Sequence, residues 1–96
     1  MKLVMILVDA ERAPDVERIL ERRGLPGYTE IPQVLGKGET GRKLGTRAFP
    51  GAETLYFTVI PPAQVDGLAG DLRSLRHARG PAEGLRVFTL DSEELL

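Results

Sequence analysis

The 96-residue sequence has no cysteine, no asparagine and a single histidine, His77. The absence of cysteine excludes a disulfide framework, a thiolate metal site and a cysteine nucleophile. With Ser74 and Ser92 as the only serines, no Ser/His/Asp set with a plausible nucleophile is present. We therefore expect a protein that is not an enzyme, with no catalytic residue and no metal site.

The chain also lacks a large excess of charge of either sign and a long hydrophobic run. The net charge is −1, which argues against the broad basic surface of a duplex-nucleic-acid-binding protein. The apolar run in MKLVMILVDAE is too short to span a bilayer and has no cleavage site after it. A hydrophobic content of 42% is typical of a globular chain. We expect one cytoplasmic domain over residues 1–96, with no nucleic-acid partner and no membrane insertion.

Four segments have the pattern of β-strands: Lys2–Asp9, Tyr28–Leu35, Thr54–Ile60 and Leu85–Leu90. The first is apolar on both faces, which is typical of a central strand. Pro32 in the second cannot donate to a ladder, so it indicates an edge position or a bulge. The third alternates, with Leu55, Phe57 and Val59 on one face and Tyr56 and Thr58 on the other. Tyr56 is expected at a subunit interface or stacked on a base.

Two segments have helical spacing. In the first, Pro14 and Asp15 suit the first turn, and Gly24 is a good stop signal. Its apolar face is formed by Val16, Ile19 and Leu20, and that of the second helix by Val65, Leu68, Leu72 and Leu75. The second helix follows Pro61-Pro62 and is closed by Gly80 and Pro81, with His77 near its end, where a cation offsets the helix dipole.

The resulting order, β-α-β-β-α-β, predicts an α+β, ferredoxin-like fold. Two helices would cover one face of the sheet and leave the other open. That open face would carry apolar residues from at least the first and third strands, and such a patch usually marks an interface. Homo-oligomerisation is the simplest way to bury it.

A long connection separates the second strand from the third. It is residues 36–53, GKGETGRKLGTRAFPGAE, with five glycines and the cations Lys37, Arg42, Lys43 and Arg47. Hairpin connections are usually two to five residues long, and those beyond about 12–15 residues are uncommon unless they are functional or disordered. We expect this loop to bind something, or to change shape when something binds.

Several short segments, in this order and spacing, resemble one family. They are MKLVMILV at the start, Asp15–Glu17 with Ile19-Leu20, GLPGYT at 24–29, VLGKG at 34–38, FTVIP at 57–61 and GPAEGLRVF at 80–88. Together they resemble the PII signalling proteins over nearly the whole chain. The long connection is similar to the T-loop of that family, and residues 80–88 are similar to its B-loop and following strand.

The resemblance implies a homotrimer that binds an effector in clefts between subunits. The implied ligand is ATP, ADP, AMP or a cyclic adenine nucleotide, with or without Mg²⁺. The implied binding residues are Gly36, Lys37, Gly38, Thr29, Gly84 and Arg86. A glycine backbone can approach an anion closely, and an arginine can hold phosphate with two hydrogen bonds. The implied loop residues that contact a target protein, such as a membrane transporter or an enzyme, are Arg42, Lys43, Arg47 and Phe49.

The chain also departs from the family pattern. Leu85 replaces the glycine before the basic residue Arg86, Thr40 replaces a glutamine linked to 2-oxoglutarate, and the loop has no tyrosine. The chain therefore resembles a divergent member rather than a classical nitrogen regulator. Which effector and which partner it has stays open at this point.

Other interpretations compete with a regulatory binding protein. Gly36 and Gly38 also suit simple turns, and Arg42, Lys43 and Arg47 also suit solvated loop charges. A CutA-like trimer, structural or metal-associated, is one alternative, although no cysteine and one histidine make a poor site for soft metals. A ferredoxin-like RNA-binding module is another, but TLYFTVI lacks the basic-glycine start of an RNP motif.

Overall fold

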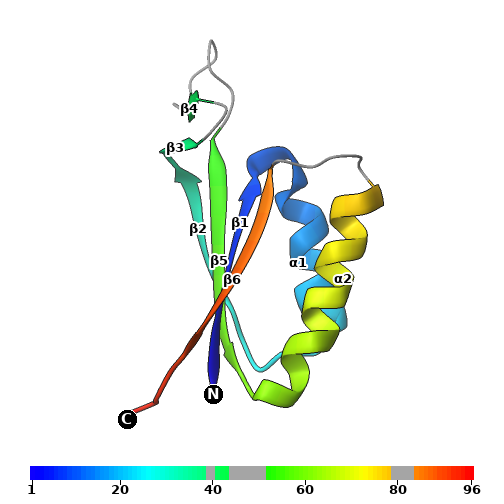
Figure 1. Cartoon of the computed structure of the whole chain (residues 1–96), viewed down its shortest axis with the longest axis vertical. Helices are drawn as coiled ribbons and strands as arrows, with labels where there is room; N and C mark the ends of the chain where they lie inside the picture. Colours follow the sequence, from blue (N-terminus) through cyan, green and yellow to red (C-terminus); the bar gives the residue numbers. More distant parts are fainter. Residues whose placement is uncertain (39–40, 44–51, 79–83) are drawn as a thin grey trace.

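The computed structural model describes residues 1–38, 41–43, 52–78 and 84–96. In this part of the chain, one sheet layer packs against one layer of helices (Figure 1). The main sheet has the order β2-β5-β1-β6, with β1 (Lys2–Asp9), β2 (Thr29–Val34), β5 (Glu53–Ile60) and β6 (Leu85–Asp91). All neighbouring strands are antiparallel. This arrangement confirms the ferredoxin-like α+β fold.

The two central strands are β1 and β5. The β1–β5 pairing runs from Lys2 opposite Ile60 to Asp9 opposite Glu53, and β6 pairs along the other side of β1. The apolar character of β1 on both faces therefore predicted its central position correctly. Antiparallel pairing fixes which residues share a face, because side chains alternate along each strand.

The edge strand β2 confirms both expectations from Pro32. It pairs on one side only, with β5, and its register shifts between Ile31 and Val34. Gln33 within the shift has φ of 58°, the left-handed region that non-glycine residues seldom adopt. Because proline cannot donate to the ladder, the strand bulges here without losing a hydrogen bond at Pro32.

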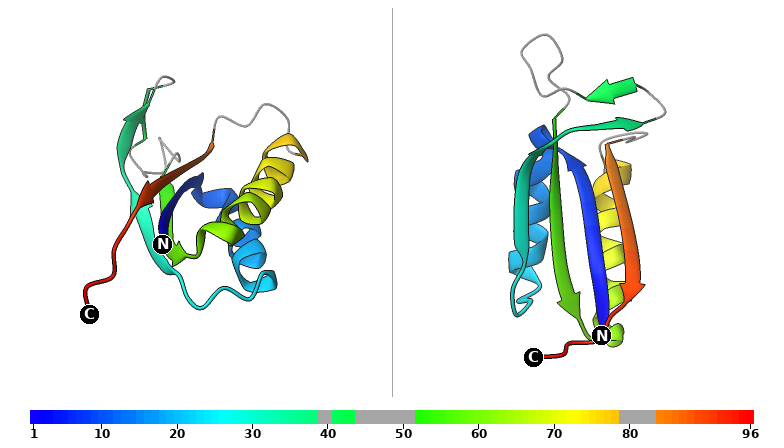
Figure 2. Two further views of the ribbon diagram at one scale, coloured as in Figure 1. Left: turned by 60° about the horizontal axis from the view of Figure 1, so that its bottom comes forward. Right: turned by 90° about the vertical axis from the view of Figure 1, so that its left-hand side faces the viewer.

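Both helices cover the same face of the sheet (Figures 1 and 2). A 3₁₀ turn, η1 (Ala10–Arg12), leads into α1 (Ala13–Arg22), and η2 (Pro62–Gln64) leads into α2 (Val65–Ala78). Gly24, just after α1, has φ of 63°, as expected of a glycine that ends a helix. The predicted end of α2 at Gly80 and Pro81 lies outside the described residues.

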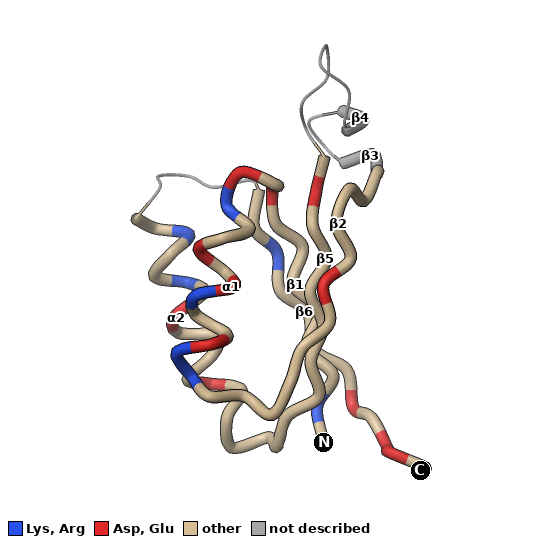
Figure 3. Tube along the Cα trace, turned by 180° about the vertical axis from the view of Figure 1, so that it is seen from behind, with Lys and Arg blue, Asp and Glu red and all other residues tan. Residues whose placement is uncertain are grey.

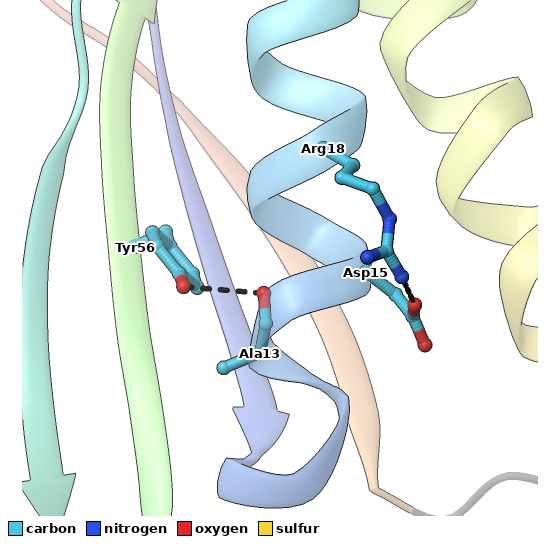
Figure 4. Close-up of polar contacts among 4 residues, drawn as sticks. All are labelled: Ala13, Asp15, Arg18 and Tyr56. Atoms are coloured by element: carbon cyan, nitrogen blue, oxygen red, sulfur yellow. Dashed lines mark hydrogen bonds and ion pairs between the residues drawn. The ribbon is translucent and has the colours of Figure 1, made fainter.

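Both helices of the helix layer contain acidic and basic residues (Figure 3). Arg23, at the end of α1, donates from Nε to Asp71 Oδ2 of α2 at 2.6 Å, and Asp15 pairs with Arg18 within α1 (Figure 4). The Arg23 guanidinium lies where a Cβ on Gly67 would be, so this glycine makes room for the pair. No helix in residues 1–38, 52–78 and 84–96 is long and apolar enough to cross a membrane.

The core lies between the helices and the inner face of the sheet. Its buried apolar residues are Val4, Ile6 and Val8 of β1, Tyr56 and Ile60 of β5, Leu85 of β6, Ala13, Val16, Ile19 and Leu20 of α1, and Leu68 and Leu72 of α2. The helical faces predicted from spacing are therefore buried, with Val65 and Leu75 packed at the margin. Val87 of β6 also packs against this core.

The long connection contains a short hairpin that its sequence pattern does not predict. β3 (Gly36–Gly38) pairs with β4 (Gly41–Lys43) to form a separate two-stranded sheet, with Gly36 opposite Lys43 and Gly38 opposite Gly41. Glycine has a low strand propensity, so the residue types of this segment do not predict a strand. Here the pairing between the two short stretches, rather than propensity, defines the strands.

Candidate functional site

One end of the main sheet gathers most of the residues predicted to bind a ligand. We call it the loop end: β1 and β2 end there, and β5 and β6 begin there. Asp9 donates its backbone N–H to Gly84 O at 2.9 Å, and Ala10 donates to Ala52 O at 3.0 Å. Beyond Val34, the chain continues at this end into the β3–β4 hairpin, which runs across the end of the sheet (Figure 2).

Gly36, Lys37 and Gly38 form β3 of this hairpin, and Gly84 immediately precedes β6. Arg86 is opposite Leu7 of β1 and its side chain is exposed. The alternation of β6 explains this exposure, because Leu85 is buried in the core and Arg86 must point the other way. Among the described residues, Arg86 has no ion-pair partner.

Thr29 is placed apart from that group. Thr29 of β2 belongs to a row of residues that runs across the sheet. The other residues of this row are Phe57 of β5, Met5 of β1 and Phe88 of β6. Thr29 and Arg86 thus lie on the two outer strands of the sheet, which are three strand spacings, about 14 Å, apart. Arg86 is also displaced by two residues along β6 from Phe88, the residue in register with Thr29. Within one chain, the structure does not bring Thr29 together with Gly84 and Arg86.

Two of the residues predicted to contact a target protein lie in β4. Arg42 is opposite Lys37 and Lys43 is opposite Gly36, so the hairpin concentrates cations at the loop end. The other two, Arg47 and Phe49, lie outside the described residues. So does Thr40, one of the positions at which the chain departs from the PII pattern.

Gly84 is in close contact with Asp9, a residue that the sequence did not single out. A Cβ built on Gly84 would lie 1.9 Å from Asp9 Oδ2 and 2.4 Å from Asp9 Cγ. Position 84 therefore has to be glycine while Asp9 keeps this place. The only sequence signal for Asp9 is a charged residue at the end of an otherwise apolar strand.

The sheet face without helices, which we call the open face, is largely apolar. Its residues are Leu3, Met5 and Leu7 of β1, Leu55, Phe57 and Val59 of β5, Phe88 and Leu90 of β6, and Ile31 of β2. Phe88 and Leu90 are each 51% exposed, values that would be unusual for core residues. This confirms the predicted apolar face from the first and third strands, and β2 and β6 extend it.

The tyrosines lie on the opposite, helix-covered face. Tyr56 is 1% exposed and donates to Ala13 O at 3.2 Å, so its expected place at an interface or against a base is wrong (Figure 4). Tyr28 packs edge-on against Tyr56 and donates to Glu21 at 3.0 Å. Desolvation, with the help of Glu21 and Glu17, raises the pKa of Tyr28 to about 12. Desolvation, with the help of Glu30, also raises the pKa of Tyr56.

The sequence matches the family model described as "Nitrogen regulatory protein P-II" over residues 1–94. The chain belongs to the P-II family. This is a family of regulatory proteins, and it is the family that the ordered motifs resemble. The CutA-like and RNA-binding alternatives belong to other families, and this match favours neither. No curated protein matches the sequence.

Solved structures of a PII-like protein from Thiomonas intermedia K12, CPII, have the same fold. The one bound to ADP, AMP and bicarbonate has a TM-score of 0.76 and 22% identity, covering 93% of this chain and 82% of that chain. The one bound to ADP and bicarbonate has a TM-score of 0.75, with the same identity and coverage. The apo form has a TM-score of 0.70 and 19% identity, covering 93% and 85%.

The P-II fold also clarifies one departure from the family sequence. Leu85 stands where a glycine was expected, which predicts less room for a phosphate beside Arg86. In the structure Leu85 is 2% exposed and packs in the core beneath the sheet. Its side chain therefore points away from the open face, where Asp9 packs against Gly84 and Arg86 is exposed.

Proposed function

We propose that this P-II chain forms a cytoplasmic homotrimer that binds an adenine nucleotide between subunits and controls a partner protein through its long loop. The observation that carries the proposal is the gathering of the β3 glycines, Gly84 and the exposed Arg86 at the loop end. The β3 glycines are far in sequence from the segment that contains Gly84 and Arg86, so this grouping is a property of the fold.

The chemistry of this end suits a phosphate group. Gly36 and Gly38 allow the backbone of the hairpin to approach an anion and point N–H groups at it. Arg86 can donate two parallel hydrogen bonds to a phosphate, and no carboxylate among the described residues forms an ion pair with it. Supporting this ligand class, CPII structures were solved with ADP and AMP.

The separation of Thr29 from Arg86 favours a site shared between copies. A nucleotide held at the loop end of one chain reaches Thr29 only if the β2 edge of a neighbouring chain approaches it. The exposed apolar residues of the open face supply a reason for such an approach, because burying them between copies is favourable. Assembly through this face and the composite site thus support each other.

Control of a partner follows from the position of the loop. A ligand that contacts Gly36, Lys37 and Gly38 in one conformation stabilises that conformation of the attached loop. Arg42, Lys43, Arg47 and Phe49 are then presented to, or withheld from, a target protein such as a transporter or an enzyme. The ligand shifts this equilibrium only by its difference in affinity for the two loop conformations.

Calorimetric titration with AMP, ADP, ATP and a cyclic adenine nucleotide, with and without Mg²⁺, tests the proposal. We expect about one ligand per subunit. Arg86→Ala should weaken binding about tenfold to a hundredfold, the range for a lost hydrogen bond to a charged group. Arg73→Ala, an exposed arginine of α2, is the matched control and should bind normally. Gly38→Val should abolish binding while the trimer persists in sedimentation.

Mixing subunits tests whether the site is shared. Thr29→Ala and Arg86→Ala chains, each weak alone, are unfolded together, refolded and titrated. If Thr29 and Arg86 contact one ligand from different chains, some mixed assemblies contain an intact pair and regain tight binding. Recovery in the mixture but in neither parent supports the composite site, whereas no recovery would mean that one chain supplies all contacts. No heat with any nucleotide would overturn the proposal.

A further inference from the structure

The edge strand β2 contains an extra residue just before the chain leaves the main sheet for the β3–β4 hairpin. Up to Ile31 the strand pairs with β5 in one register, and at Val34 the register is shifted by one residue. Pro32 and Gln33 therefore stand opposite a single residue of β5, Thr54, which is the arrangement of a β-bulge. Within it, Gln33 is the one non-glycine residue with a positive φ among the described residues.

Packing does not explain the left-handed backbone of Gln33. The side chain of Gln33 is exposed, as are those of Ile31 and Pro32, and β2 has a neighbouring strand on one side only. A residue with a Cβ disfavours the left-handed region relative to glycine, on the order of tenfold in population. Strained residues of this kind cluster at places where proteins change conformation. A rearrangement of the bulge would disturb few buried side chains.

An extended Gln33 would give β2 a second way to pair. If the register of Ile31 continued, Gln33 would be opposite Glu53, and every residue beyond it would change face. Leu35, which is 52% exposed in the bulged form, would then share the open face with Ile31. The strand would also continue in its own direction, whereas in the bulged form the chain turns and β3 runs across the end of the sheet (Figure 2).

We infer that Gln33 is the hinge of the long loop: its left-handed form places the β3–β4 hairpin across the loop end, and its extended form moves the hairpin away. The consequence for binding rests on the proposed nucleotide site, which includes Gly36 and Gly38 of β3. A chain with the hairpin displaced lacks those backbone contacts. The apparent affinity therefore falls in proportion to the fraction of chains in the bulged form.

A bulge that is only a fixed kink makes a different prediction. If the rest of the fold holds Gln33 in one conformation, substitutions at this position change stability but leave the hairpin where it is. The position of the hairpin therefore separates the two roles. Because the side chain of Gln33 is exposed, substitutions act through backbone preference rather than through lost packing.

The first measurement is the distance from the hairpin to the helix layer. The chain has no cysteine, so two spin labels can be attached at Arg42→Cys in β4 and at Ser74→Cys, an exposed position in α2. Pulsed electron paramagnetic resonance measures the distance between the labels. The labelled chain is refolded with an excess of unlabelled chain, so that distances within one chain dominate.

The labelled chain is compared with Gln33→Gly, Gln33→Asn and Gln33→Val. Glycine and asparagine adopt the left-handed region most readily, and a β-branched residue does so least. We expect one main distance with glutamine, glycine or asparagine at position 33. Gln33→Val should show a second distance, with a population on the order of tenfold larger than in Gln33→Gly. Thr89→Val, an exposed site in the edge strand β6 where the register is unbroken, is the control and should show no second distance.

The second measurement is calorimetric titration of the same chains, without labels, with AMP, ADP and ATP. Gln33→Val should bind each nucleotide more weakly than Gln33→Gly, by the factor that the populations of the two distances give. Gln33→Asn should bind like Gln33→Gly, and Thr89→Val should bind like the unaltered chain. If Gln33→Val fails to fold, Gln33→Thr, which is also β-branched, replaces it.

The outcomes separate the hinge from the function to which it is linked. Identical distances in Gln33→Gly and Gln33→Val overturn the hinge. A shift in the distances with equal nucleotide affinities overturns the link between the hinge and the site. A shift in the distances with no nucleotide bound by any chain supports the hinge and overturns the proposed nucleotide site.

Discussion

The two faces of the sheet differ in a way that is clearest along β5. Its inward face, under the helices, consists of Thr54, Tyr56, Thr58 and Ile60, whereas its outward face is Leu55, Phe57 and Val59. The more apolar set is the one that the helices do not cover. The hydrophobic alternation along β5 therefore identified an apolar surface, but it is the surface that the two helices leave uncovered.

Hydrogen bonds make the polar inward face compatible with burial. Thr58 donates from Oγ1 to Gly27 O at 2.5 Å, and Tyr56 donates to Ala13 O. A buried hydroxyl without a partner is costly, and these bonds remove most of that cost. The outward face has apolar side chains that need no hydrogen-bond partners. For example, Val59 of β5 lies next to Leu3 of β1, which lies next to Leu90 of β6.

The largest expected effect comes from truncating the inward face. Tyr56→Ala should lower the free energy of unfolding by about 3–5 kcal/mol, because it removes a fully buried aromatic side chain. The loss should be the same at low and high protein concentration, since the side chain packs within one chain. Denaturant unfolding at two protein concentrations measures both properties. A loss below about 1 kcal/mol would show that Tyr56 is not part of the core.

The second-largest effect is expected when a charged side chain is placed on the outward face. Phe57→Lys should leave the circular dichroism spectrum intact but dissociate the assembly, because a charge cannot be buried unpaired between copies. Sedimentation velocity measures the state of assembly. Gln64→Lys, which adds the same charge at an exposed position in η2, should assemble normally. Assembly of the Phe57→Lys chain would exclude the open face as the interface.

Smaller changes in stability are expected from substituting one glycine on the open face and one glycine in the helix layer. Gly84→Ala should destabilise by about 1–3 kcal/mol, because its Cβ overlaps Asp9. Gly70→Ala in α2 should stabilise by about 0.5–1 kcal/mol, because nothing lies within 4 Å of its Cβ and alanine favours helix. Thermal unfolding measures both changes. Adding Asp9→Gly to Gly84→Ala should recover stability; if it does not, the overlap is not the cause.

The smallest expected effect is an alkaline loss of stability from the inward tyrosines. The pKa of Tyr28 is raised from 10.0 to about 12, so the folded state holds its proton more tightly than the unfolded state. Its contribution is complete below pH 10 and is lost as the pH rises towards about 12. Tyrosinate absorbance measures this directly, since the chain has two tyrosines and no tryptophan. A normal titration of Tyr28 in a Tyr56→Phe chain would contradict the prediction.

Much of the fold could be predicted from the sequence. The strand Lys2–Asp9 has the bounds that its apolar run indicates, and Pro32 marks both the edge and the bulge of β2. These features follow from short-range rules on periodicity and proline geometry. The β3–β4 hairpin escaped prediction, because glycine-rich stretches carry no strand signal.

The candidate site could be predicted only in part. Gly36, Gly38 and Arg86 were singled out through a family resemblance, and their gathering at the loop end is consistent with it. The separation of Thr29 from Arg86 depends on the strand order, which local patterns do not contain. The contact of Asp9 with Gly84 joins the end of the first strand to the start of the last, so no local signal could reveal it.

The sequence by itself determined the order of the elements and the alternation along each strand, because both depend on neighbours within a few residues. Only the tertiary structure decided which side of that alternation the helices cover, and which residues meet at the loop end. Those choices depend on long-range pairing of β1 with β5 and β6. The helices cover the side of β5 on which buried hydroxyl groups find hydrogen-bond partners, and they leave the more apolar side of β5 uncovered.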